Sequence, residues 1–122
     1  MKTGIVIFAH GSRLESANDA VRRTAASMAA MGGYDMAVSA FLEGGKPDLP
    51  EAAASLARQG AERIVVIPYF LTLGTHMQRD LPVIVQGILE AHPGLEIQVT
   101  PPLDGHPALE EILLDRARKA LK

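Results

Sequence analysis

The sequence predicts an α/β fold with three layers, in which a four-stranded parallel sheet carries helices on both faces. Four short apolar segments alternate along the chain with four segments whose apolar residues recur at helical spacing. Strands that alternate with helices form parallel sheets with right-handed crossovers. The chain has 122 residues, which suits one hydrophobic core, so we expect a single domain over residues 1–122.

The pattern of apolar and polar residues in the four strands predicts the order of the strands in the sheet. Residues 4–9 and 64–67 are unbroken apolar runs, whereas residues 36–41 and 96–100 alternate apolar with more polar side chains. Central parallel strands are buried on both faces and are continuously apolar, while half-exposed strands alternate. The first and third strands therefore belong in the middle, which gives the order 2-1-3-4. Pro68 ends the third strand, where pairing stops.

Four helices are expected between and after these strands. The first follows Ser12, which can cap it, and stops at Gly32-Gly33. Pro50 opens the second as its first helical residue. The third carries an apolar stripe over residues 81–89, and the fourth is an amphipathic helix over residues 109–121.

Composition excludes several classes of protein. The net charge of −2 argues against a general nucleic-acid binder. The chain has no cysteine, so a disulfide scaffold, a zinc-thiolate site and a thiol nucleophile are excluded, and a transition metal must use His, Asp or Glu. No apolar stretch reaches the ~20 residues of a membrane span and no signal peptide is visible. We expect a soluble, cytoplasmic protein.

The predicted strand order points to a site. The winding direction reverses between the first and third strands, and ligands of open α/β sheets bind at the carboxyl ends of strands near such a reversal. His10 follows the first strand and His76 follows the third, while Glu43 follows the second. Two imidazoles and one carboxylate should thus meet on one side of the sheet. This ligand set suits Fe, Co, Ni or Zn.

Each of these residues has a plainer interpretation. A histidine after a strand is often a loop hydrogen-bonder, and Glu43 could be a solvated turn residue; the coincidence of two histidines at the favoured positions makes a metal site the better interpretation. His92 and His106 are expected at a helix end and in a turn or cap. Arg13, Lys46 and Arg79 are either surface charges or holders of substrate carboxylates.

Two other functions compete with a metal enzyme. The turn after the first strand could hold a phosphate, but no Walker or Gly-x-Gly-x-x-Gly pattern occurs. A histidine-dependent phosphoryl-transfer enzyme would need an arginine before His10-Gly11, and Ala9 stands there. A nucleophilic Ser12 lacks the Gly-x-Ser-x-Gly elbow. The other competitor is a non-catalytic carrier of a metal.

Several motifs are distributed along the chain, namely residues 9–13, residues 41–43 with Pro47, residues 67–71, 74–76 and 80–82, and residues 105–107. Each motif alone is weak, but together they resemble the small CbiX-type sirohydrochlorin chelatases of the class II chelatase family. The resemblance covers nearly the whole chain. Under this resemblance the non-catalytic competitor is a carrier of a tetrapyrrole or a metal.

The resemblance implies a chelatase-like fold and an enzyme that inserts a divalent metal into sirohydrochlorin, in cobalamin or related tetrapyrrole biosynthesis. Cobalt is expected, with nickel and iron as alternatives, and no organic cofactor. It implies that His10 and His76 bind the metal, that Glu43 shares the catalytic role, and that a homodimer holds the macrocycle between its subunits. The glycine-rich loop over residues 43–47 departs from the family's pattern.

From these positions we also expect a set of residues around the substrate. Two histidines leave the metal's coordination open, which suits release to a macrocycle. His10, His76 or Glu43 could accept the pyrrole protons. The expected substrate-binding residues are Ser12, Arg13, Lys46, Gly74, Thr75 and Arg79.

Overall fold

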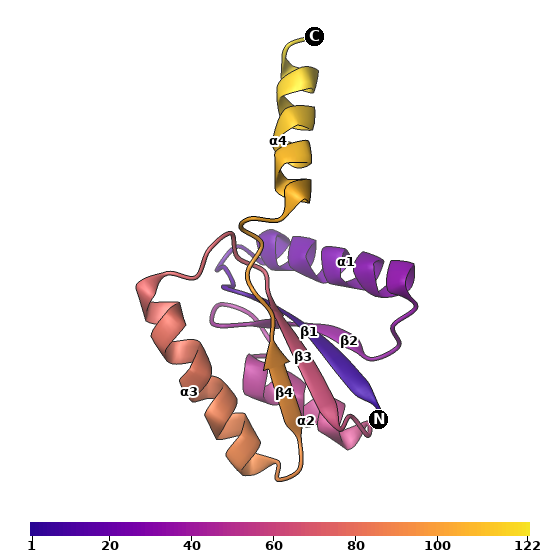
Figure 1. The fold of residues 1–122 in the computed structure, drawn as a ribbon, viewed down its shortest axis with the longest axis vertical. Coiled ribbons are helices and arrows are strands. Elements are labelled where there is room, and N and C mark those ends of the chain that lie inside the picture. Colours follow the sequence, from indigo (N-terminus) through magenta and orange to yellow (C-terminus); the bar gives the residue numbers. More distant parts are fainter.

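The computed structural model describes residues 1–122, and it has the predicted sheet of four parallel strands in the order β2-β1-β3-β4. Figure 1 shows the sheet with α2 and α3 on one side and α1 on the other. The strands are β1 (Thr3–Ala9), β2 (Ala37–Phe41), β3 (Arg63–Pro68) and β4 (Glu96–Val99), and the helices are α1 (Glu15–Gly32), α2 (Leu49–Arg58), α3 (Thr75–Ala91) and α4 (Pro107–Ala120).

The hydrophobic core lies between the sheet and the pair α2 and α3. Val6 and Phe8 of β1 and Ile64 and Val66 of β3 point into it and are buried. Because side chains alternate along a strand, these residues occupy one face of the sheet. Leu56 of α2 completes the packing against them. The central position of β1 and β3 follows from these buried apolar side chains.

The opposite face of the sheet is only partly covered. The helix α1 packs over β2, and Ala25 and Asn18 are its buried residues. On this face Val65 and Ile67 of β3 stay half-buried. The unbroken apolar run of the third strand predicts burial on both faces, but no helix of the chain covers this part of the sheet.

Two helix starts differ from the sequence prediction. Ser12 does not cap α1: its Oγ accepts a 3.0 Å hydrogen bond from the amide of Leu14, which is the N-cap and uses no side chain. This bond spans two residues and completes a turn before the helix. The helix α2 begins at Leu49, one residue before Pro50, because Asp48 and Glu51 form a reciprocal capping box.

The edges of the sheet and the last helix complete the fold. The edge strand β4 has four residues, and at the other edge the amide of Phe41 donates a 2.9 Å hydrogen bond to the carbonyl of Pro47. Figure 1 shows α4, in yellow, extending beyond the carboxyl ends of the strands. None of its residues is buried. His106 caps α4, as Nδ1 accepts from the amide of Ala108 at 3.0 Å. None of the four helices has the length and apolar character that a membrane span needs.

Candidate functional site

The turn that follows β1 is held tightly against the loop that follows β2. Gly11 has a φ of +90°, and a Cβ at this position would lie 1.6 Å from the carbonyl oxygen of Glu43. Only glycine fits this close approach of two backbones. The amide of Glu43 donates a 3.0 Å hydrogen bond to the carbonyl of His10. The sequence His10-Gly11 therefore brings the histidine beside the carboxylate of the next strand end.

The hydrogen bonds of His10 define its free nitrogen. Nδ1 lies 3.3 Å from the carbonyl oxygen of Gly11. A carbonyl can only accept, so Nδ1 carries the proton of the neutral ring and Nε2 keeps its lone pair. Nε2 lies 3.9 Å from Oε1 of Glu43, and both side chains are exposed. A free imidazole nitrogen and a carboxylate oxygen thus lie side by side at the carboxyl edge of the sheet.

The spacing between His10 and Glu43 suits a shared metal ion. Metal bonds to imidazole nitrogen and to carboxylate oxygen are each about 2.0–2.2 Å long in zinc sites. Two such ligands around one ion stand at most about 4.2 Å apart, and about 3.4 Å apart at a tetrahedral angle. The separation of 3.9 Å lies inside this limit. A small side-chain rotation is enough for both atoms to reach one ion.

His76 lies at the same edge, in the first turn of α3. Its Nδ1 is 3.1 Å from a guanidinium nitrogen of Arg79, which can only donate, so this lone pair is engaged. The second guanidinium contact of Arg79 is a 3.3 Å hydrogen bond from Nε to Asp80. For His76 to bind a metal, through Nδ1 or through Nε2 after the ring proton shifts to Nδ1, Arg79 has to move away, because its guanidinium can only donate.

The chain does not contain a closed metal site. No group of three His, Cys, Asp or Glu side chains lies close enough to hold one ion. The structure pairs His10 with Glu43, while His76 contacts Arg79 instead. A metal site that uses both His10 and His76 remains a prediction. In this conformation one chain offers such a site only a few ligands.

Sequence reasoning missed Asn18, which organises the site. Its side chain is buried and accepts a 2.9 Å hydrogen bond from the amide of Ser12. Its Nδ2 lies 2.9 Å from the carbonyl of Ser12 and 3.0 Å from that of Gly44. Asn18 therefore joins the turn after β1 to the loop after β2. The only signal in the sequence is a polar residue on the buried stripe of α1.

Phe70 is a second residue that the sequence prediction did not single out. Its ring lies 6.4 Å from that of His10, centroid to centroid, with an interplanar angle of 82°. It also packs edge-on against Phe8 at 6.0 Å. This edge-to-face contact restricts the rotation of the His10 ring from the side of β3.

The expected substrate-binding residues lie around the same edge. Arg13 is exposed. Lys46 pairs with Glu51 at 3.2 Å and lines a polar hollow of about 570 Å³ together with Arg22 and Glu43. On the other side of His10, Gly74 is the N-cap of α3 and Thr75 its first residue, and neither supplies a capping side chain. These residues remain predictions as substrate contacts.

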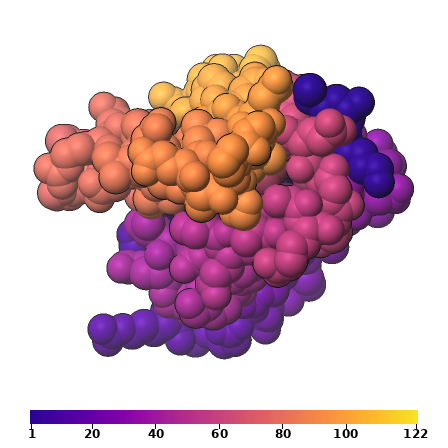
Figure 2. Space-filling model, turned by 90° about the horizontal axis from the view of Figure 1, so that it is seen from below, coloured from indigo at the N-terminus to yellow at the C-terminus, as the bar shows by residue number.

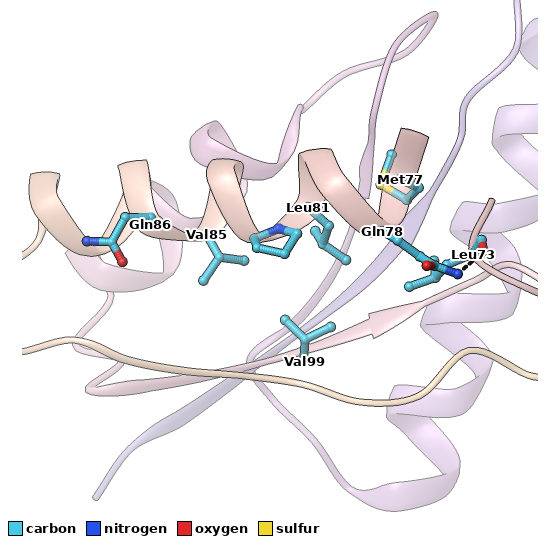
Figure 3. A pocket seen from close by; sticks show the side chains of 8 residues that line it. Leu73, Met77, Gln78, Leu81, Val85, Gln86 and Val99 are labelled. Carbon is cyan, nitrogen blue, oxygen red and sulfur yellow. Dashed lines mark hydrogen bonds between the residues drawn. The ribbon is translucent and has the colours of Figure 1, made fainter. Parts of the chain in front are cut away.

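An apolar groove runs between α3 and the edge strand β4. It has a volume of about 390 Å³ and is lined chiefly by Leu73, Met77, Leu81 and Val99. Figure 3 shows Leu81, Val85 and Val99 on facing sides of this groove. Figure 2 shows α3, in salmon and orange, standing out from the body of the molecule. No histidine or carboxylate lines the groove.

The CbiX family matches residues 4–120 of the chain. A sirohydrochlorin cobaltochelatase of Methanothermobacter thermautotrophicus is 31% identical over 135 residues, which cover 98% of this chain and 94% of that protein. The chloroplastic sirohydrochlorin ferrochelatase of Arabidopsis thaliana is 30% identical over 97% of this chain, but the chain spans only 52% of that longer enzyme.

Two solved structures share the fold. The CbiX protein of Marinobacter aquaeolei is 25% identical, with a TM-score of 0.85 over 98% of this chain and 97% of that one. The sirohydrochlorin chelatase SirB of Bacillus subtilis in complex with cobalt has a TM-score of 0.90 at 23% identity, and this chain covers 51% of it. With a family match that spans nearly its whole length, the chain belongs to the CbiX family.

Proposed function

We propose that the protein is a sirohydrochlorin chelatase that inserts a divalent metal, cobalt in the first place, into the macrocycle. The observation that carries this proposal is the free Nε2 of His10 beside Glu43 at the carboxyl edge of the sheet. Family membership supports it, since the relatives include sirohydrochlorin cobaltochelatases and a ferrochelatase. Nickel and iron remain the alternative metals, because imidazole ligands accept several first-row ions.

In this proposal the metal is a substrate that must leave the protein. His10 binds it through Nε2, Glu43 is the second ligand, and His76 joins from α3. Such an open ligand set leaves coordination positions for the macrocycle nitrogens, whereas a structural site is closed by four protein ligands. As two metal–nitrogen bonds form, the two pyrrole N–H groups lose their protons. Glu43 and the released imidazoles are the bases within reach of that step.

Arg79 has a double role in the proposal. In the free protein its guanidinium engages Nδ1 of His76. The carboxylates of sirohydrochlorin are better acceptors for a guanidinium than a neutral imidazole, because both partners are charged. Substrate binding would then draw Arg79 away and free the ring of His76. Arg13 and Lys46 are the other cations proposed to hold the carboxylates.

The proposal includes a homodimer with the macrocycle between two subunits. It is supported by the incomplete ligand set of one chain and by the length of SirB, of which this chain covers 51%. A cytoplasmic location stays a prediction.

Anaerobic sirohydrochlorin mixed with Co²⁺ and the protein tests the activity through the absorbance change of the macrocycle. His10→Ala and His76→Ala should each slow insertion at least about tenfold, since each removes a ligand. His92→Ala is the matched control, because His92 lies at the other end of α3. Folded His10→Ala and His76→Ala proteins that insert metal at the wild-type rate would sink the proposal.

Two other functions make different predictions in the same experiment. A carrier binds Co²⁺ and sirohydrochlorin tightly but does not accelerate insertion. A phosphoryl-transfer enzyme forms a phosphohistidine or releases phosphate from generic substrates. Family membership favours the chelatase over both.

A further inference from the structure

The loop that carries Glu43 receives little support from its own backbone. It joins β2 to α2 and contains Gly44 and Gly45 in succession. Glycine gives the chain more conformational freedom than any other residue. Beyond the bond from the amide of Glu43 to the carbonyl of His10, the amides of residues 44–46 donate no hydrogen bond to another backbone group. The part of the loop after Glu43 therefore depends on side chains that hold it from outside.

Two side chains of α1 bind this part of the loop. Nδ2 of Asn18 donates a hydrogen bond to the carbonyl of Gly44 at 3.0 Å, and Nη2 of Arg22 donates to the carbonyl of Lys46 at 3.2 Å. The spacing of four residues places Asn18 and Arg22 on the same side of the helix. Arg22 thus binds the loop three residues after Glu43.

The guanidinium of Arg22 is held in one orientation. Nη1 donates hydrogen bonds of 2.6 and 2.7 Å to the carboxylates of Glu15 and Asp19. Cζ lies 5.0 Å from the centroid of the buried Phe41 ring. With these contacts only 33% of the Arg22 side chain is exposed, against 64% and 52% for its two carboxylate partners. Arg22 is therefore more enclosed and more fully bonded than the arginine of an isolated surface ion pair.

The two loop contacts of Arg22 lie on either side of Glu43 in the chain. Phe41 precedes Glu43 by two residues, and Lys46 follows it by three. One planar group therefore contacts both ends of the segment that presents the carboxylate. Arg22 and Glu43 line the same polar hollow, but no hydrogen bond or ion pair joins them. Any effect of Arg22 on the pair of Glu43 and His10 passes through the loop.

Only arginine makes all of these contacts at once. Its guanidinium carries five N–H donors in a fixed fork, and its flat faces stack on aromatic rings. The ammonium of a lysine is a point charge on a flexible stem. It cannot bind both carboxylates, the loop carbonyl and the Phe41 ring in one geometry. Arg22→Lys therefore keeps the charge and removes the geometry.

We propose that Arg22 is a positioning residue of the metal site, which holds the loop so that the carboxylate of Glu43 stays within reach of Nε2 of His10. This inference rests on the proposed function, in which these two side chains bind the metal. A ligand that is already in place loses less conformational freedom on binding, so a preorganised site has the higher affinity. Without the guanidinium fork, the two glycines let the loop adopt other conformations, in which Glu43 is farther from His10.

Arg22 is poorly suited to hold a substrate carboxylate itself. Nη1 already binds the carboxylates of Glu15 and Asp19, and Nη2 binds a carbonyl. Two negative charges beside the guanidinium also repel a third one. The effect of Arg22 is therefore expected on the binding of the metal and not on the binding of the macrocycle.

A double-mutant cycle tests the inference on the metal alone. Co²⁺ affinity is measured by titration calorimetry without sirohydrochlorin for the wild type, Arg22→Lys, Glu43→Gln and the double variant, after circular dichroism has verified folding. Arg22→Lys should weaken binding about tenfold in the wild type and less than about twofold in the Glu43→Gln protein, because residues that act through one another are not additive. An equal loss in both backgrounds, or no loss in either, overturns the inference.

Two further substitutions complete the test. Arg23→Lys, at the next and exposed position of α1, is the matched control and should leave the Co²⁺ affinity unchanged. Asp19→Asn removes one of the two carboxylates that orient the guanidinium, and it serves if Arg22→Lys does not fold. It should weaken Co²⁺ binding about two- to threefold, and only where the carboxylate of Glu43 is present. A loss that persists in the Glu43→Gln protein is a charge effect and contradicts the inference.

The insertion assay provides a second readout. Arg22→Lys should raise the KM for Co²⁺ and leave the KM for sirohydrochlorin unchanged. The opposite result would make Arg22 a holder of substrate carboxylates and overturn the inference. A Glu43→Gln protein with wild-type Co²⁺ affinity would refute the ligand pair of the proposed function and the inference together. An effect of Glu43→Gln without an effect of Arg22→Lys would refute the inference alone.

Discussion

The amide of Glu43 and the carbonyl of His10 are joined by a 3.0 Å hydrogen bond, which connects the ends of two neighbouring strands at the site. This bond brings the carboxylate within 3.9 Å of Nε2 of His10. It depends on Gly11, because any side chain there collides with the carbonyl of Glu43. The proposed metal-binding pair therefore rests on the backbone of one tight turn.

Gly11→Ala should destabilise the protein by about 2 kcal/mol or more, since it adds a positive φ strain to a backbone collision. Gly87→Ala is the matched control. It lies within α3, with open space at its Cβ, and should stabilise the protein by about 0.5–1 kcal/mol. Urea unfolding of both variants measures the difference. Equal stabilities would show that the turn relaxes without cost.

Glu43→Gln tests whether this carboxylate binds the metal. The substitution keeps the shape and removes the charge, so Co²⁺ affinity in the absence of sirohydrochlorin should fall about ten- to a hundredfold. Titration calorimetry measures it, and Glu90→Gln, near the other end of α3, is the control. An unchanged affinity with slower metal insertion would assign Glu43 as a base and not as a ligand.

Asn18→Ala should cost about 2 kcal/mol of unfolding free energy, because the partly buried amide of Ser12 and the carbonyl of Gly44 lose their partner. The loops after β1 and β2 should also loosen, which lowers the insertion rate. Ser27→Ala, at an exposed position of the same helix, should change stability by less than about 0.5 kcal/mol. Chemical denaturation and the insertion assay together check this, and a variant as stable and active as the wild type contradicts it.

Arg79→Ala distinguishes the binding of the metal from the binding of the macrocycle. It removes the donor to Nδ1 of His76, so Co²⁺ affinity should be retained or increased, while the KM for sirohydrochlorin should rise. Arg58→Ala at the end of α2 is the control. A loss of Co²⁺ affinity as large as that of His76→Ala would instead mean that Arg79 orients the ring for the metal.

Two carboxylates should make the stability sensitive to acid. Hydrogen bonds from Arg22 and then Asn18 lower the pKa of Glu15, and the amide of Asp48 and then the ammonium of Lys46 lower the pKa of Glu51. A lowered pKa in the folded state stabilises the protein above the ordinary carboxyl value of 4.5. This stability is lost as the pH falls below that value.

The measurement for this prediction is the unfolding free energy between pH 3 and pH 6, a range set by about one to two units around the ordinary carboxyl pKa. Glu15→Gln and Glu51→Gln should each make the unfolding free energy fall less steeply as the pH is lowered. Glu62→Gln serves as a comparison at an exposed position outside these clusters. A slope that neither substitution changes would assign the acid sensitivity to other groups.

Much of the fold could be predicted because the pattern of apolar and polar residues along a strand reflects its burial. The apolar runs of β1 and β3 indicate central strands, and the order β2-β1-β3-β4 is confirmed. The same reasoning predicts that residues after β1, β2 and β3 share one edge of the sheet. His10 and Glu43 are indeed close there, whereas the contact of His76 with Arg79 depends on side-chain rotamers that spacing does not encode.

Other features lay outside the reach of a single sequence. The stripe of α4 predicts a buried side, whereas none of its residues is buried in the structure. Asn18 is one polar residue on an otherwise small and apolar side of α1, and only the three-dimensional structure shows which two loops it connects. The start of α2 was missed by one residue because Asp48 and Glu51 cap the helix reciprocally, a pattern that outweighs the preference of Pro50 for the first position.

The short strand β4 and the hydrogen bond between Phe41 and Pro47 affect how the protein aggregates at high concentration. Unpaired strand edges template aggregation, and proteins avoid it with short, charged or covered edges. Here β4 offers only four residues, beginning with Glu96, and the loop at Pro47 occupies the last amide of β2. The sheet is thereby protected from growing into fibres through its edge strands.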